Sequence, residues 1–211
     1  MTIAFDHIIL GCLDLDAGAE ALSALFGAPP AGRGVHKMMG THNALWNLGD
    51  AYVELVAVNP EAPHPGRPRW FGLDDPATLA RLECGPRLLT WAVAGPGAEA
   101  VAAAAPFPMG RMEAFARDDL TWRVAVPEAG TPGLDGAFPL TIEWTGGLHP
   151  AKRLGDQGLR CPSLAVTHPQ VETLRRALGE PPAPVTLREG PPQIEAVLQT
   201  PKGEVVFSAF H

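Results

Sequence analysis

Residues 34–55 read GVHKMMGTHNALWNLGDAYVEL, and this stretch guides the interpretation of the whole chain. It ends in Tyr52-Val53-Glu54-Leu55, an alternating run typical of a β-strand in which every second side chain shares one face. Glu54 therefore lies among apolar neighbours and needs a partner, because a buried unpaired charge costs several kcal/mol. The best candidate partner is His7 in the opening strand, AFDHIIL. The sequence thus predicts a His7–Glu54 pair.

The composition indicates a globular protein. The chain has 211 residues, of which 46% are hydrophobic and 18% charged, enough for one large or two small domains. No apolar run approaches the ~20 residues that span a bilayer, and the N-terminus lacks signal-peptide features, so we expect a cytoplasmic protein. Three cysteines without CxxC spacing suit a reducing compartment. The net charge of −7 argues against a nucleic-acid partner.

Strand and helix patterns recur along the chain in the order strand, helix, strand, strand, strand. The first unit covers 1–58, with strands at 3–10, 33–39, 43–48 and 51–58 and a helix from Asp14 or Asp16 to Phe26. A Pro-rich linker over 59–86 leads to a second unit at 87–145, and a more divergent third unit covers 151–211. Because one unit leaves a sheet face uncovered, we expect an α+β fold in which βαβββ units pair into a cupped mixed β-sheet around a cavity.

Several short motifs resemble a known family. They are 34–36, Gly40-Thr41, Asn43, Leu45 and 52–55, followed by the IEW sequence at 142–144 and His149-Pro150. Together with DHIIL in the first strand, they resemble the glyoxalase-like domain family of the vicinal oxygen chelate superfamily. The resemblance covers residue 3 to about residue 150 well, so 1–150 is predicted to be a glyoxalase-like domain. The third unit, 151–211, matches only in its order of strands and helix, and it is expected to pack on the first two units.

The resemblance implies a metal site, since each unit of the superfamily characteristically supplies one ligand from its first strand and one from its last. Carried onto this sequence, unit one gives His7 and Glu54, and unit two gives Thr90 and Glu143. Thr90 departs from the pattern because a hydroxyl replaces imidazole poorly. His7, Glu54 and Glu143 remain as metal ligands, and three ligands plus water make an open site. Mixed His/Glu ligation suits Zn, Fe, Mn, Ni or Co.

Five further residues are candidates for substrate binding: His36, Thr41, Asn43, Trp144 and His149. Each also has a plain structural interpretation. Histidines at loops are often solvent-facing, Thr and Asn beside a glycine turn often hold its backbone, and tryptophans in strands are often core. In the same way, His7 could be a hydrogen-bonded core histidine, and Glu54 or Glu143 could lie on an exposed strand face.

The resemblance implies a metal-assisted enzyme of lyase, isomerase or dioxygenase type, acting on a small oxygen-rich molecule. Glu54 or Glu143 would be the general base if it is not a ligand. The alternative is a non-catalytic binding or resistance protein, which the Thr90 departure favours; an interaction scaffold is the least favoured class. Motifs of nucleotide, serine-hydrolase and HExxH metalloprotease sites are absent from the sequence. We also expect a small-molecule substrate, no membrane partner and a possible homodimer.

Overall fold

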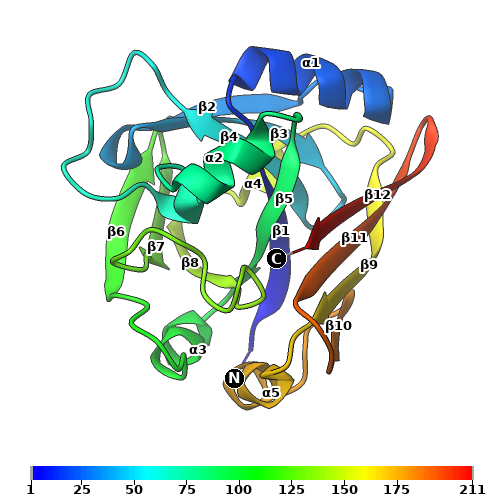
Figure 1. The fold of residues 1–211 in the computed structure, drawn as a ribbon. Coiled ribbons are helices and arrows are strands. Elements are labelled where there is room, and N and C mark those ends of the chain that lie inside the picture. The colour runs from blue at the N-terminus through cyan, green and yellow to red at the C-terminus, as the bar shows by residue number, and fades with distance from the viewer. Residues whose placement is uncertain (1, 211) are drawn as a thin grey trace.

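Two β-sheets form the molecule (Figure 1), and the computed structural model describes residues 2–210. The larger sheet has eight strands in the order β2-β3-β4-β1-β5-β8-β7-β6, and the smaller has four in the order β10-β9-β11-β12. The strands are β1 Ala4–Gly11, β2 Gly32–His36, β3 Thr41–Asn47, β4 Tyr52–Val58, β5 Arg87–Ala94, β6 Met112–Arg117, β7 Leu120–Ala125, β8 Leu140–Gly146, β9 Arg160–Thr167, β10 Val185–Arg188, β11 Gln193–Thr200 and β12 Gly203–Phe210. The α-helices are α1 Leu15–Phe26, α2 Pro76–Leu82, α3 Ala98–Ala103, α4 Pro150–Arg153 and α5 Val171–Leu178.

Local sequence signals place the ends of the first helix. The Asp14 side chain accepts a hydrogen bond from the backbone N–H of Ala17, which satisfies one of the unpaired donors at the start of α1. Gly27 ends the helix in the left-handed conformation, at φ 75°, which a glycine adopts without steric cost. Both ends agree with the prediction. In residues 2–210 no helix is long and apolar enough to cross a membrane.

The predicted strand over 33–39 is shorter in the structure. β2 stops at His36, and Lys37–Met39 forms a 3-10 turn that Gly40 closes at φ 60°. The strand ends there because the chain must reverse tightly into β3, where His36 pairs with Thr41. This turn keeps His36 buried at the edge of the sheet.

The first two units share one topology, and together they make the cup. In unit one the first strand, β1, pairs in parallel with the last strand, β4. In unit two β5 pairs in the same way with β8. An antiparallel β1–β5 seam joins the units, and β2 and β6 form the two free edges of the eight-stranded sheet. The predicted α+β fold of paired βαβββ units is confirmed.

The third unit keeps the predicted element order but pairs differently. Its first strand, β9, lies between β10 and β11, rather than beside the last strand, β12. The order of helices and strands along the chain does not determine which strands pair with each other. The repeated order alone therefore does not predict this sheet topology. The division of the chain into 1–150 and 151–211 remains a prediction.

The two faces of the large sheet have different environments. One face packs against the second sheet and α1, in a core that joins Ile8, Val53 and Trp91 to Leu164 and Ile194. The other face is concave and carries a separate apolar cluster that includes Ile9, Val56 and Trp70. His7 and Glu54 lie on this concave face. The third unit therefore covers the outside of the cup.

Candidate active site

A bulge in β1 brings two consecutive side chains together. Phe5 pairs with Val93 and His7 with Ala92 on β5, so Asp6 is an extra residue on the β1 side of the ladder. A β-bulge changes the direction of the side chains next to it. Two consecutive side chains, which in a regular strand would point to opposite faces, can then contact each other. Asp6 Oδ1 lies 2.5 Å from His7 Nδ1, and the carboxylate is buried. Asp6 was not predicted as a site residue.

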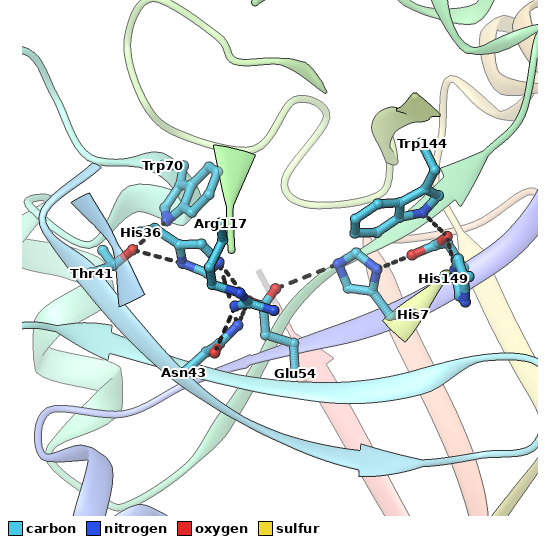
Figure 2. Close-up of polar contacts among 10 residues, drawn as sticks. His7, His36, Thr41, Asn43, Glu54, Trp70, Arg117, Trp144 and His149 are labelled. Carbon is cyan, nitrogen blue, oxygen red and sulfur yellow. Dashed lines mark hydrogen bonds and ion pairs between the residues drawn. The ribbon is translucent and has the colours of Figure 1, made fainter. Parts of the chain in front are cut away.

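His7 is the centre of the site (Figure 2). Its Nε2 atom lies 3.5 Å from Glu54 Oε2, an ion-pair distance beyond a good hydrogen bond, and its ring stacks on Tyr52 with centroids 4.4 Å apart. Within the described chain, this buried nitrogen has no hydrogen-bond partner. Burial alone would lower the pKa of His7, but the carboxylates of Asp6 and Glu54 raise it to about 9. At neutral pH an unused Nε2–H therefore faces the cavity.

Glu54 supplies the opposite charge. Its Oε1 atom accepts a 2.6 Å hydrogen bond from Asn43 Nδ2, and it lies 3.9 Å from His36 Nε2. Burial would raise the pKa of this carboxyl, but His7, His36 and the Asn43 amide lower it to about 2. Glu54 is therefore ionised. The predicted proximity of His7 and Glu54 in one cavity is confirmed.

A cation from unit two reaches the same cavity. Arg117, at the end of β6, donates from Nη1 to Asn43 Oδ1 at 3.4 Å, so the Asn43 amide bridges Arg117 and Glu54. The guanidinium crosses directly over Gly34, where an added Cβ would lie 1.9 Å from Arg117 Nη1. Gly34 therefore leaves space for the arginine. Arg117 was not predicted, and Gly34 was the one sequence signal near it.

His36 is neutral and held in one orientation. Asn43 Nδ2 lies 3.4 Å from its Nε2, and its Nδ1 lies 3.3 Å from Thr41 Oγ1. Burial lowers the pKa of His36 to about 4. The amide donates to Nε2, so Nδ1 carries the proton and donates to Thr41. Thr41 also accepts from Trp70 Nε1 at 3.1 Å, so it orients its neighbours from behind the cavity wall.

The cavity between these groups is small, about 30 Å³. That volume holds about one or two water molecules, so a substrate must displace side chains as it enters. Its polar end and its aromatic wall are formed by His7, His36, Asn43, Tyr52, Glu54, Arg117, Trp70, Phe71, Trp122 and Trp144. Of the five predicted substrate-binding residues, His36, Asn43 and Trp144 line this cavity. The site is partly open and mixed in polarity.

Glu143 lies on the wrong face of its strand for the predicted role. In β8 the residues that line the cavity are Leu140, Ile142 and Trp144, and alternation turns the residue between the last two away. Glu143 instead pairs with Arg123 at 2.9 Å and is partly exposed. Residues 2–210 contain no group of three His, Cys, Asp or Glu side chains that could bind one metal ion. The structure therefore places Glu143 away from His7 and Glu54, contrary to the expected position, and the predicted three-ligand set is not brought together within residues 2–210.

His149 supports the site from outside the cavity. Its Nδ1 accepts from the backbone N–H of Ala151 at the start of α4, which leaves Nε2–H to donate to Asp6 Oδ2 at 2.9 Å. Trp144 Nε1 donates to the same oxygen at 2.9 Å. Figure 2 shows His149 on the far side of His7 from Glu54, with the Trp144 ring above His7. His149 thus fixes Asp6, and Asp6 fixes His7.

The charged groups of the cavity predict a stability maximum near pH 6.5. The pKa of folded His7, about 9, lies above its ordinary 6.5, so its contribution is complete below pH 6.5 and is lost as pH rises through 9. The folded pKa values of His36 and Glu54, about 4 and about 2, lie below the ordinary 6.5 and 4.5. Their contributions are complete above those ordinary values and are lost as pH falls through the folded ones.

Urea unfolding midpoints measured across this range should therefore form a bell. We expect His7→Gln to flatten its alkaline side, because the variant removes the group that loses its proton there. A wild-type midpoint that stays constant between pH 6.5 and pH 9 would contradict the charge assigned to His7.

The fold and the cavity first define a class, an α+β protein whose two βαβββ units form a cup around a buried histidine and glutamate. The glyoxalase-like domain family matches residues 5–181, and the chain belongs to that family. The predicted family is thereby confirmed, and the match extends from the first two units into the third.

One of two similar solved structures supports the fold. A hypothetical protein from Staphylococcus aureus has 15% identity and a TM-score of 0.56, covering 99% of this chain and 85% of its own. Methylmalonyl-CoA epimerase from Mycobacterium tuberculosis has 16% identity and a TM-score of 0.45, covering 71% of this chain and 91% of its own. At 15% identity the first similarity supports the fold alone, and with its TM-score of 0.45 the second supports no conclusion. A search among curated proteins gives no match.

Proposed function

We propose that this protein is an enzyme of isomerase or lyase type, which moves a proton at a carbon next to a carbonyl in a small carboxylate-bearing substrate. One observation carries the proposal. The buried Nε2–H of His7, which is without a hydrogen-bond partner in residues 2–210, faces the Glu54 carboxylate across 3.5 Å. A proton donor and a proton acceptor that lie next to each other in one small cavity suit general acid–base chemistry.

In this proposal each cavity group has a defined task. Glu54 accepts the proton from the substrate carbon, and the negative charge that develops on the carbonyl oxygen is stabilised by His7 Nε2–H. The Arg117 guanidinium binds the carboxylate, for which its planar fork is suited. The proton returns from Glu54 to carbon in an isomerisation.

The low pKa of Glu54 in the free protein is compatible with this role. It depends on His7 and its neighbours, since burial alone would raise it. A substrate oxygen that pairs with His7 takes that positive charge away from Glu54, so the pKa of Glu54 rises. Its basicity therefore develops when the substrate is in place.

The metal predicted from the family resemblance does not fit the donor set. His7 Nε2 and Glu54 Oε2 could approach one ion. His36 Nε2 lies 3.9 Å from Glu54 Oε1 in the same cavity, but no three His, Cys, Asp or Glu side chains of residues 2–210 are placed to hold one ion together. Catalytic Zn²⁺ sites use three protein ligands. No step is therefore derived through a metal, and the dioxygenase version of the prediction is not adopted.

A binding protein without catalysis is the second candidate. The low pKa of Glu54, about 2, favours it, because such a carboxylate is a weak base until a ligand changes its surroundings. The same cavity would then hold a small anion through Arg117 and His7.

The two candidates are separated by a paired measurement of binding and exchange. Small 2-oxo acids, 2-oxoaldehyde thiol adducts and catechols are titrated by calorimetry. In D2O, NMR then follows exchange of the hydrogen next to the carbonyl of the first two groups, while turnover is followed for the catechols. We expect bound 2-oxo acids to exchange faster than free ones. Tight binding without exchange or turnover would support the binding protein and contradict the enzyme.

Gly34→Ala is expected to weaken carboxylate binding about 10-fold or more, as much as Arg117→Ala does. The added methyl group would occupy the position of the guanidinium, and a hydrogen bond to a charged group contributes about 1.5–3 kcal/mol. Calorimetric titration with a 2-oxo acid measures the effect. Gly155→Ala is the control, since its added Cβ meets nothing within 4 Å. Unchanged binding by Gly34→Ala would contradict the role of Arg117.

A further inference from the structure

We propose that the substrate carries a short alkyl group, which binds in a second, apolar cavity behind Trp70 and Phe71. This proposal rests on the proposed function for the carboxylate that Arg117 binds. The second cavity has a volume of about 20 Å³, and Met109, Phe138 and prolines form much of its wall. It lies next to the His7–Glu54 cavity, because Trp70, Phe71 and Leu140 line both.

The wall between the cavities contains a strained residue. Phe71 has a φ of 61°, a strained conformation that is rare for a bulky side chain. The turn around it is braced, since Arg69 contacts Asp74 at 2.6 Å and Gly72 N–H donates to Gly130 O at 2.9 Å. Phe71 lines both cavities, so this braced turn fixes part of the wall that they share.

The polar side-chain atoms that line the second cavity already have hydrogen-bond partners. Thr90, at the strand position where the family resemblance expects a ligand, donates from Oγ1 to Gly136 O at 2.8 Å. Trp70 Nε1 donates to Thr41. The occupant must therefore be apolar. A volume of about 20 Å³ suits about one or two methyl-sized groups, so the alkyl group is short.

The test uses straight-chain 2-oxo acids from 2-oxopropanoate to 2-oxoheptanoate, titrated into the full chain by calorimetry. We expect affinity to rise about fourfold per methylene for the first members, the value for burying one CH₂ group, and then to level off as the cavity fills. Turnover plays no part in this measurement, so a failed enzyme assignment would not hide the result.

Two variants of Met109 should shift the optimum in opposite directions. Met109→Phe fills the cavity and should remove the gain with chain length, whereas Met109→Ala enlarges it and should move the optimum to longer acids. Met38→Phe is the matched control, because Met38 is exposed and lies outside both cavities.

The outcomes separate the two proposals. Affinity that is independent of chain length in the wild type, or equal responses of both Met109 variants, would overturn the apolar subsite while leaving Arg117-dependent binding intact. Failure of every acid to bind would overturn the subsite together with the proposed function. If Met109→Phe does not fold, the shift expected for Met109→Ala still decides the question.

Discussion

Glu54→Gln is expected to slow hydrogen exchange of a bound 2-oxo acid by about 10²–10⁴-fold, the usual effect of losing a general base. The amide keeps the shape of the side chain and its contact with Asn43, but it cannot accept a proton from carbon. Ligand affinity should change modestly, by the ~1–3 kcal/mol of one altered polar contact. NMR exchange rates and calorimetry on the same sample measure both quantities.

Glu143→Gln is the matched control. It makes the same chemical change on the face of β8 turned away from the cavity, where Glu143 pairs with Arg123. Its exchange rate should equal that of the wild type. Equal losses in the two variants would contradict the assignment of Glu54 as the base and restore the role that the sequence suggested for Glu143.

Asp6→Asn is the second change with a large expected effect, a loss of exchange on the order of 10²–10⁴-fold. Without the carboxylate, the pKa of His7 should fall from about 9 toward 6.5, and the imidazole loses the group that fixes its orientation. The alkaline limb of the pH–rate profile should therefore move to lower pH.

NMR titration of the His7 ring nitrogens distinguishes this positioning role from a merely structural one. If Asp6→Asn lowers the unfolding midpoint but leaves the pKa of His7 near 9, the carboxylate would be structural alone, and the account of His7 as proton donor would be wrong.

Alternation along strands predicted the central pair of the site. His7 and Glu54 lie on two strands that pair directly in parallel, so two-residue periodicity was enough to place them in one cavity. Alternation along β8 places Glu143 on the opposite face from Ile142 and Trp144, which line the cavity. The same rule would therefore have predicted that Glu143 points away from the cavity. Its predicted role came from a family position, and strand register overrode it.

Asp6 and Arg117 could not be predicted in the same way. Asp6 meets His7 because of a bulge, and a bulge depends on how β1 pairs with β5 rather than on the local pattern. Arg117 comes from the opposite edge of the sheet and reaches Asn43 across Gly34. Such contacts depend on how the two edges of the curved eight-stranded sheet come together. A local sequence pattern does not determine this arrangement. The β9-centred sheet of the third unit was missed for a related reason.

The central claim is that His7 and Glu54 move protons without a three-ligand metal site. Its most direct test begins with elemental analysis of the purified protein before any chelator is added. Hydrogen exchange of a bound 2-oxo acid is then measured in D2O before chelation, after chelation and after adding back Zn²⁺, Fe²⁺, Mn²⁺, Ni²⁺ or Co²⁺. The account predicts one exchange rate throughout, slowed about 10²–10⁴-fold by Glu54→Gln and unaffected by Glu143→Gln. An exchange rate that disappears on chelation and returns with one ion would contradict it.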